Sequence, residues 1–119
     1  MHPEISAVLK NYFDGIFNGD TALLRTTFHP HAALYGEIKG AQYYKTLDHY
    51  LDAVDQRKSP RELNETYLME TVSIDVLGDV ASAKVHCVML GFNYVDFLSL
   101  IRIEGKWVIV NKLFTHVPT

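Results

Sequence analysis

Residues 72–85 read VSIDVLGDVASAKV, and this stretch decides the fold. Apolar and polar residues alternate on both sides of Gly78-Asp79, which has the Gly-X form of a two-residue type II′ hairpin turn. The turn predicts two antiparallel strands that pair Val76 with Ala81, Ile74 with Ala83, and Val72 with Val85. One face of this hairpin is therefore apolar and is expected to pack against a hydrophobic core.

Further strands are expected after this hairpin, and helices before it. Strand-forming residues separated by turns predict strands near 65–77, 80–91, 94–104 and 107–116, with a second turn around Gly105. Apolar residues at helical spacing from Ile5 to Phe17 predict a first helix. Asp20 can cap a short second helix, which ends by His29 because the residue before a proline avoids the helical region.

A short strand over Ala32–Ile38 is expected to precede a third helix. The buried stripe of that helix is predicted to hold Tyr43, Leu47, Tyr50, Leu51 and Val54. This order predicts an α+β fold in a single domain over residues 1–119. Three N-terminal helices would pack on a strongly curved, mainly antiparallel sheet, forming a cone with an internal pocket.

Composition limits the possible partners. The chain has 119 residues, with 11 Lys+Arg against 14 Asp+Glu, so no basic excess favours nucleic-acid binding. No stretch approaches the roughly 20 apolar residues of a membrane span, and the start of the chain lacks the pattern of a signal peptide. The single cysteine, Cys87, suits a reducing compartment. A cytoplasmic protein without nucleic-acid or membrane partners is therefore expected.

The second face of the predicted sheet suggests a dimer. It is polar near the hairpin tip and becomes apolar toward the pairs Met69/Val88 and Tyr67/Leu90. Three helices can close only one face of a sheet, so we expect a second copy of the chain to cover the other as a homodimer. The alternative is that the third helix wraps further around the sheet.

Three segments carry a family resemblance: NYFDGIFNGD at 11–20, DFLSL at 96–100 and GKWVIVNK at 105–112. With them the whole chain resembles the nuclear-transport-factor-2-like superfamily, a cystatin-like α+β cone shared with ketosteroid isomerases and SnoaL-like polyketide cyclases. Within it, the chain is most similar to the putative lumazine-binding family. The resemblance implies the cone, its pocket and a small-molecule ligand.

The resemblance also tests one catalytic mechanism. Ketosteroid isomerases use a carboxylate base together with a tyrosine and a protonated acid that stabilise the developing oxyanion. By resemblance, Tyr12 matches the tyrosine, whereas the base falls on Gly36 and the acid on Ser99. Because neither of these residues carries a carboxyl group, isomerase chemistry by this route is disfavoured.

Other polar residues could replace the missing acids. With strict alternation along strand 65–77, Glu70 would face the pocket opposite Cys87 and could act as a base. A bulge before Val72 would turn Glu70 to solvent instead. His29 and His31 have a metal-ligand spacing, but Pro30 and the lack of a third ligand argue against a metal site, and no cofactor is expected. Cys87 is expected to be a buried, inert thiol.

The candidate pocket is aromatic with few polar groups. Aromatic rings can stack on flat ligands, and phenol or amide groups can orient them. Asn111 would lie across from Ser99 if the turn at Gly105 had three residues, but not if it had two. The predicted lining consists of Tyr12, Tyr35, Tyr44, Glu70, Phe97, Ser99 and Asn111.

Three functions remain open from the sequence. The leading expectation is a non-catalytic protein that binds a small hydrophobic or planar molecule. The first alternative is a lyase-, cyclase- or isomerase-type enzyme that uses Tyr12 with Glu70 or a histidine. The second alternative is a structural dimer without a ligand.

Overall fold

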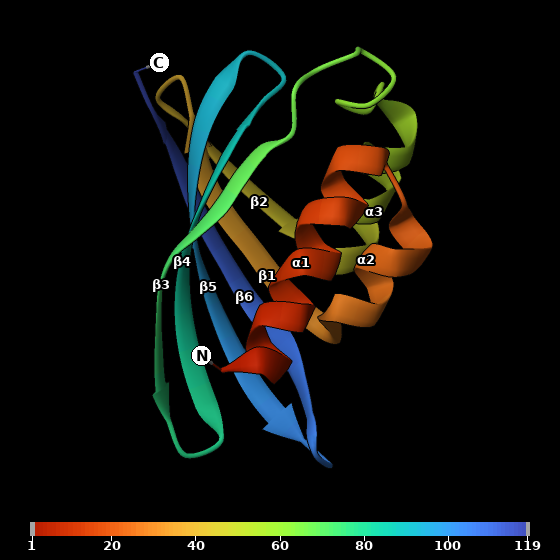
Figure 1. The fold of residues 1–119 in the computed structure, drawn as a ribbon. Coiled ribbons are helices and arrows are strands. Elements are labelled where there is room, and N and C mark those ends of the chain that lie inside the picture. Colours follow the sequence, from red (N-terminus) through yellow and green to blue (C-terminus); the bar gives the residue numbers. More distant parts are fainter. Residues whose placement is uncertain (1, 119) are drawn as a thin grey trace.

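The computed structural model describes residues 2–118, which form three helices and one six-stranded sheet. Figure 1 shows all three helices on one side of a curved, twisted sheet, as an α+β cone requires. The strand order is β2-β1-β6-β5-β4-β3, and every neighbouring pair is antiparallel except β1 and β6. The elements are α1 (Pro3–Asn18), α2 (Thr21–Thr27), β1 (Phe28–Ile38), β2 (Ala41–Thr46), α3 (Leu47–Gln56), β3 (Leu68–Leu77), β4 (Val80–Met89), β5 (Phe92–Ile103) and β6 (Lys106–Val117).

The core lies between the helices and the inner face of the sheet. The apolar stripe of α1 is buried as predicted, from Ile5 through Leu9 to Ile16. It packs on alternate residues of the central strands, such as Val85 of β4 and Leu98 of β5. Within residues 2–118, no helix combines the length and apolar character that crossing a membrane requires.

The hairpin between β3 and β4 confirms the predicted turn but contains a bulge. Leu77 pairs with Val80 across Gly78-Asp79, and Gly78 has the positive φ of 60° that a type II′ turn needs at this position. The register then shifts, since Ser73 pairs with Lys84 but Thr71 pairs with Val85. The predicted pair of Val72 with Val85 is therefore wrong, and the alternative with a bulge at Val72 is the one observed.

The segment before α3 differs from the prediction. Tyr43 was expected on the third helix, but residues 41–46 form β2, an edge strand paired with β1. Two adjacent tyrosines suit a strand, and α3 begins only where the Thr46 side chain accepts a hydrogen bond from the His49 N–H. The remaining stripe residues of α3 are buried as predicted: Leu47, Tyr50, Leu51 and Val54.

The hairpin between β5 and β6 contains a second bulge. Ile103 pairs with Lys106, so the turn at Glu104-Gly105 has two residues. The register shifts at Val110, and this extra residue brings Asn111 opposite Ser99 after all. A two-residue turn with a bulge thus produces the pairing for which a three-residue turn had seemed necessary.

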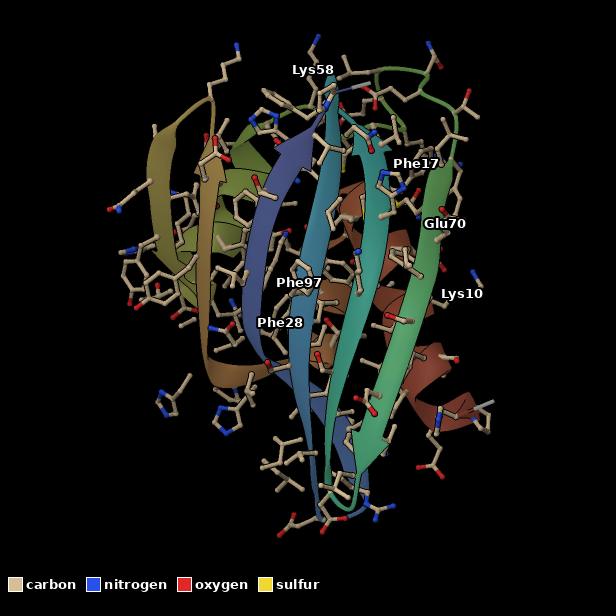
Figure 2. All side chains as sticks on the ribbon, turned by 90° about the vertical axis from the view of Figure 1, so that its left-hand side faces the viewer. Lys10, Phe17, Phe28, Lys58, Glu70 and Phe97 are labelled. Atoms are coloured by element: carbon tan, nitrogen blue, oxygen red, sulfur yellow. The ribbon has the colours of Figure 1, made fainter. Side chains whose placement is uncertain are left out.

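The outer face of the sheet carries many exposed apolar side chains (Figure 2), including Phe97 near its centre. In the described structure α3 packs against α2, β1 and β2 and leaves this face open. The homodimer through this face therefore stays a prediction. Phe97→Glu is expected to convert a dimer to a monomer in light scattering, because it places a charge in the apolar contact.

Leu77→Glu is the matched control for this dimer prediction. It adds the same charge at an exposed leucine beside the hairpin turn, away from the centre of the face, and should leave a dimer intact. A wild-type protein that stays monomeric over the whole concentration range would contradict the prediction.

Candidate functional site

A buried hydrogen bond joins the first helix to the sheet. Tyr12 of α1 is 0% exposed, and its hydroxyl donates to Asp96 Oδ2 at 2.6 Å. Asp96 is only 2% exposed and lies on β5, where it shares the inner face with Leu98 and Leu100. Residues two apart on a strand point to the same face, so the alternation that buries these leucines also directs the Asp96 carboxylate inward.

A buried lysine lies beside this pair. Lys112 of β6 is 6% exposed, and its Nζ lies 5.4 Å from the ring centroid of Tyr12 and 4.8 Å from that of Tyr50. Phe114 contributes a third ring at 5.2 Å. Aromatic faces attract a cation but leave its three N–H donors without acceptors. Among the described residues, Lys112 forms neither a hydrogen bond nor an ion pair within 4.0 Å, so its donors are available to a ligand.

Asp96, Lys112, Tyr50 and Phe114 line a cavity of about 50 Å³ between the sheet and α3. A single water molecule needs roughly 10–15 Å³ of such space, so the cavity can hold a small organic molecule of a few atoms. Asp96 and Lys112 lie at its buried end, whereas Ile38, Tyr43 and Tyr94 are partly exposed. The rest of the lining is Tyr50, Arg57, Met89 and Phe114.

Two further polar groups of the lining are buried without a protein partner. They are the hydroxyl of Tyr50 and the Nε and Nη2 atoms of Arg57, the residue that caps α3. A buried donor without an acceptor is costly, more so when it carries charge. Both residues line the cavity, so a ligand whose acceptor oxygens reach these atoms would satisfy them.

The surroundings set the protonation of two groups. Burial, and next the Asp96 carboxylate, raises the pKa of Tyr12 well above its usual value, so its hydroxyl stays a donor. Burial by itself lowers the pKa of Lys112, but Tyr50 and Asp96 outweigh burial and raise that pKa to about 12. Lys112 is therefore an ammonium cation at neutral pH.

The raised pKa of Lys112 predicts a loss of stability at alkaline pH. A pKa that is higher in the folded chain contributes stability that is fully present below pH 10.5 and is lost between pH 10.5 and 12. In urea unfolding, the wild type should lose more stability over this range than Lys112→Met. If stability falls equally with pH in both proteins, the raised pKa of Lys112 is contradicted. Lys10→Met, which replaces an exposed lysine, serves as the control.

None of the seven predicted lining residues lines this cavity, and Tyr12 contacts it only through its hydrogen bond to Asp96 and its ring beside Lys112. Tyr35 and Tyr44 are exposed and stack at 4.8 Å between ring centroids beside an open hollow of about 770 Å³. Phe97 and Ser99 lie on the outer face of β5, opposite in parity to Asp96. Asn111 pairs with Ser99, and its side chain donates to the Ala33 carbonyl. These five residues were expected beside Tyr12 in one pocket, and none of them lines the cavity at Asp96 and Lys112.

Glu70 also lies outside the cavity. Because of the bulge at Val72, Met69 packs on the core, whereas the Glu70 side chain is 71% exposed. The carboxylate lies 3.6 Å from the His86 ring on the outer face, so the sequence-based option of Glu70 as a buried base is wrong.

The expected absence of a carboxylate beside Tyr12 is wrong as well. By resemblance the acid position fell on Ser99, but the carboxylate next to the phenol is Asp96, three residues earlier on the same strand. The sequence contained a signal for this position. Assigning Leu98 and Leu100 to the buried face of the strand would also have placed Asp96 on that face, because the three residues are two apart. Lys112, Tyr50 and Arg57 were also missed as site residues.

Gly36 and Cys87 have structural roles. A Cβ at Gly36 would overlap the Phe114 ring, so the glycine allows this ring to pack against Lys112. Cys87 is buried, as predicted, and burial raises the pKa of its thiol. His29 and His31 stack on each other at 5.6 Å, and no group of three potential metal ligands occurs within residues 2–118.

Comparison with known proteins agrees with this architecture. Residues 1–115 match the family described as putative lumazine-binding. The chain is 25% identical over 107 residues to a protein named aldolase FrzH from Cladobotryum sp., a match that covers 90% of this chain and 84% of that protein.

Two solved structures are similar over nearly the whole chain. A nuclear-transport-factor-2-like protein of unknown function from Shewanella baltica OS155 matches with a TM-score of 0.85 and 25% identity, covering 99% of this chain and 94% of that one. Another from Silicibacter pomeroyi DSS-3 matches with a TM-score of 0.82 and 23% identity, covering 97% and 94%.

Proposed function

The chain belongs to the putative lumazine-binding family within the nuclear-transport-factor-2-like fold, and we propose that it is an enzyme that removes a proton next to a carbonyl group in an aldolase-type reaction. The observation that carries the proposal is the Asp96 carboxylate, held by Tyr12 in a cavity that also contains the Lys112 cation. A similar protein named an aldolase supports the reaction class.

Asp96 has the position of a general base. Tyr12 donates to Oδ2, and among the described residues no other group is hydrogen-bonded to the Asp96 side chain, so Oδ1 of this cavity-lining residue has no protein partner. Tyr12 acts as a positioning residue, because its donated hydrogen bond fixes the carboxylate at the end of the cavity. Positioned bases of this kind contribute about 10²- to 10⁴-fold to a rate.

Lys112 and Tyr50 can stabilise the negative charge that forms on the substrate. When Asp96 Oδ1 takes the proton, the C–H electron pair forms the double bond of an enolate, and negative charge appears on the carbonyl oxygen. The Lys112 ammonium and the unpartnered Tyr50 hydroxyl both line the cavity and can donate to that oxygen. The enolate carbon then bonds to the carbonyl carbon of a second substrate, and the resulting alkoxide takes the proton back from Asp96.

The protonation of Lys112 favours this route over an imine. An imine forms only from a neutral amine, whereas the pKa of Lys112 is raised to about 12. Lys112 thus acts through its charge and its N–H donors. This differs from the non-catalytic binding expected from the sequence, which rested on the missing carboxylate.

The exchange of carbon-bound protons for deuterium tests the proposal without knowledge of the second substrate. Small ketones, aldehydes and oxo acids are incubated with the protein in D₂O, and the loss of the α-proton signal is followed by NMR. Acceleration over buffer for at least one class of compound is expected. Exchange at the buffer rate for the entire panel would reject the proposed enzyme, and ligand binding without exchange would favour a non-catalytic protein.

A further inference from the structure

The cavity holds more positive than negative charge. Among the described residues of the lining, Lys112 and Arg57 are the basic side chains and Asp96 is the one carboxylate, while burial raises the pKa of the Tyr43 and Tyr94 phenols. Within the described residues, no acidic side chain forms an ion pair with either cation. One unit of positive charge is left over, which a ligand with a single negative charge would neutralise.

Arg57 offers a specific shape to such a ligand. Its Nε and Nη2 are the two donors on one edge of the guanidinium group, and both are buried without a protein partner. At the protein surface the same two donors of Arg102 converge on a single carboxylate oxygen, Asp79 Oδ1, at 2.9 and 2.5 Å. A carboxylate is the group that fills this edge, since its two oxygens match two parallel N–H bonds.

We propose that the substrate is a short-chain oxo acid, whose carboxylate binds Arg57 while its ketone lies between Lys112 and Asp96. The small volume of about 50 Å³ favours the shortest acids of this class. Arg57 is therefore assigned the recognition of the substrate anion, separate from the proton transfer at Asp96. The reaction itself rests on the proposed function, whereas the binding of an anion does not.

Pyruvate and pyruvamide form a matched pair for the test. They have the same number of non-hydrogen atoms and the same ketone, but only pyruvate carries a charge. Wild-type protein should exchange the methyl protons of pyruvate faster than those of pyruvamide. Arg57→Gln should remove this preference and lower the exchange of pyruvate by about 10- to 150-fold, as expected for a lost hydrogen-bonded charge.

Two further variants support the interpretation. Arg57→Lys keeps the charge but loses the two-donor edge, so it should retain part of the preference for pyruvate. Arg25→Gln removes an exposed arginine that pairs with Asp48 and should behave as wild type. Thermal unfolding of each variant verifies that it is folded before its exchange rate is compared.

Oxamate binding separates this inference from the proposed function. Oxamate has the shape and charge of pyruvate but cannot form an enolate, so its stabilisation of the protein against heat reports binding alone. Stabilisation of wild type but not of Arg57→Gln, without any proton exchange, would support the anion site and reject the enzyme. Equal exchange of pyruvate and pyruvamide, unaffected by Arg57→Gln, would reject the anion site and leave the enzyme standing.

Discussion

Asp96→Asn should slow the exchange of substrate α-protons by about 10²- to 10⁴-fold, because it removes the only carboxylate that residues 2–118 contribute to the cavity lining. The amide oxygen of asparagine can still accept the hydrogen bond from Tyr12, so the fold should persist. The measurement is the NMR exchange rate of the best substrate, compared with wild type under the same conditions.

Glu70→Gln is the control for this prediction. It makes the same chemical change in a carboxylate on the outer face, beside His86. Its exchange rate should equal that of wild type. If the exchange rate falls in Glu70→Gln but is unchanged in Asp96→Asn, the general base lies on the outer face and the assignment of Asp96 is wrong.

Lys112→Met should lower the same exchange rate by about 10²- to 10³-fold, since it removes a donor and a charge from the developing oxyanion. Methionine has a similar length and packs well against the rings of Tyr12, Tyr50 and Phe114. The loss should therefore appear in the rate while the protein remains folded.

Lys84→Met provides a matched comparison for Lys112→Met. Lys84 also lies over an aromatic ring, that of Phe97 at 5.7 Å, but on the outer face. It should have no effect on exchange. Borohydride reduction in the presence of pyruvate should leave the protein mass unchanged, and a mass gain on Lys112 would show an imine and contradict the role given to its charge.

Local periodicity was enough to predict the scaffold. The stripe from Ile5 to Ile16 and the turn at Gly78-Asp79 depend on neighbouring residues alone, and both occur as predicted. β2 was missed because Tyr43 and Leu47 have helical spacing, although pairing with β1 holds residues 41–46 extended. Such pairing depends on a distant strand that local periodicity does not reveal.

The site was harder to predict because it depends on which face each strand residue takes. Bulges at Val72 and Val110 reverse which residues beyond them face the core. The local sequence does not predict the position of either bulge. On β5 both faces carry large apolar side chains, since Phe97 alternates with Leu98. Alternation alone therefore did not distinguish Asp96 from Ser99 as the inward polar group.

A crystal structure of the protein with oxamate tests most directly whether the charged cavity is the active site. The account predicts oxamate between Arg57 and Asp96, with its carboxylate on Nε and Nη2 of Arg57 and its amide group beside Asp96 Oδ1. Oxamate bound in the outer hollow at Tyr35 and Tyr44 would contradict it. So would a cavity closed by a direct ion pair between Lys112 and Asp96.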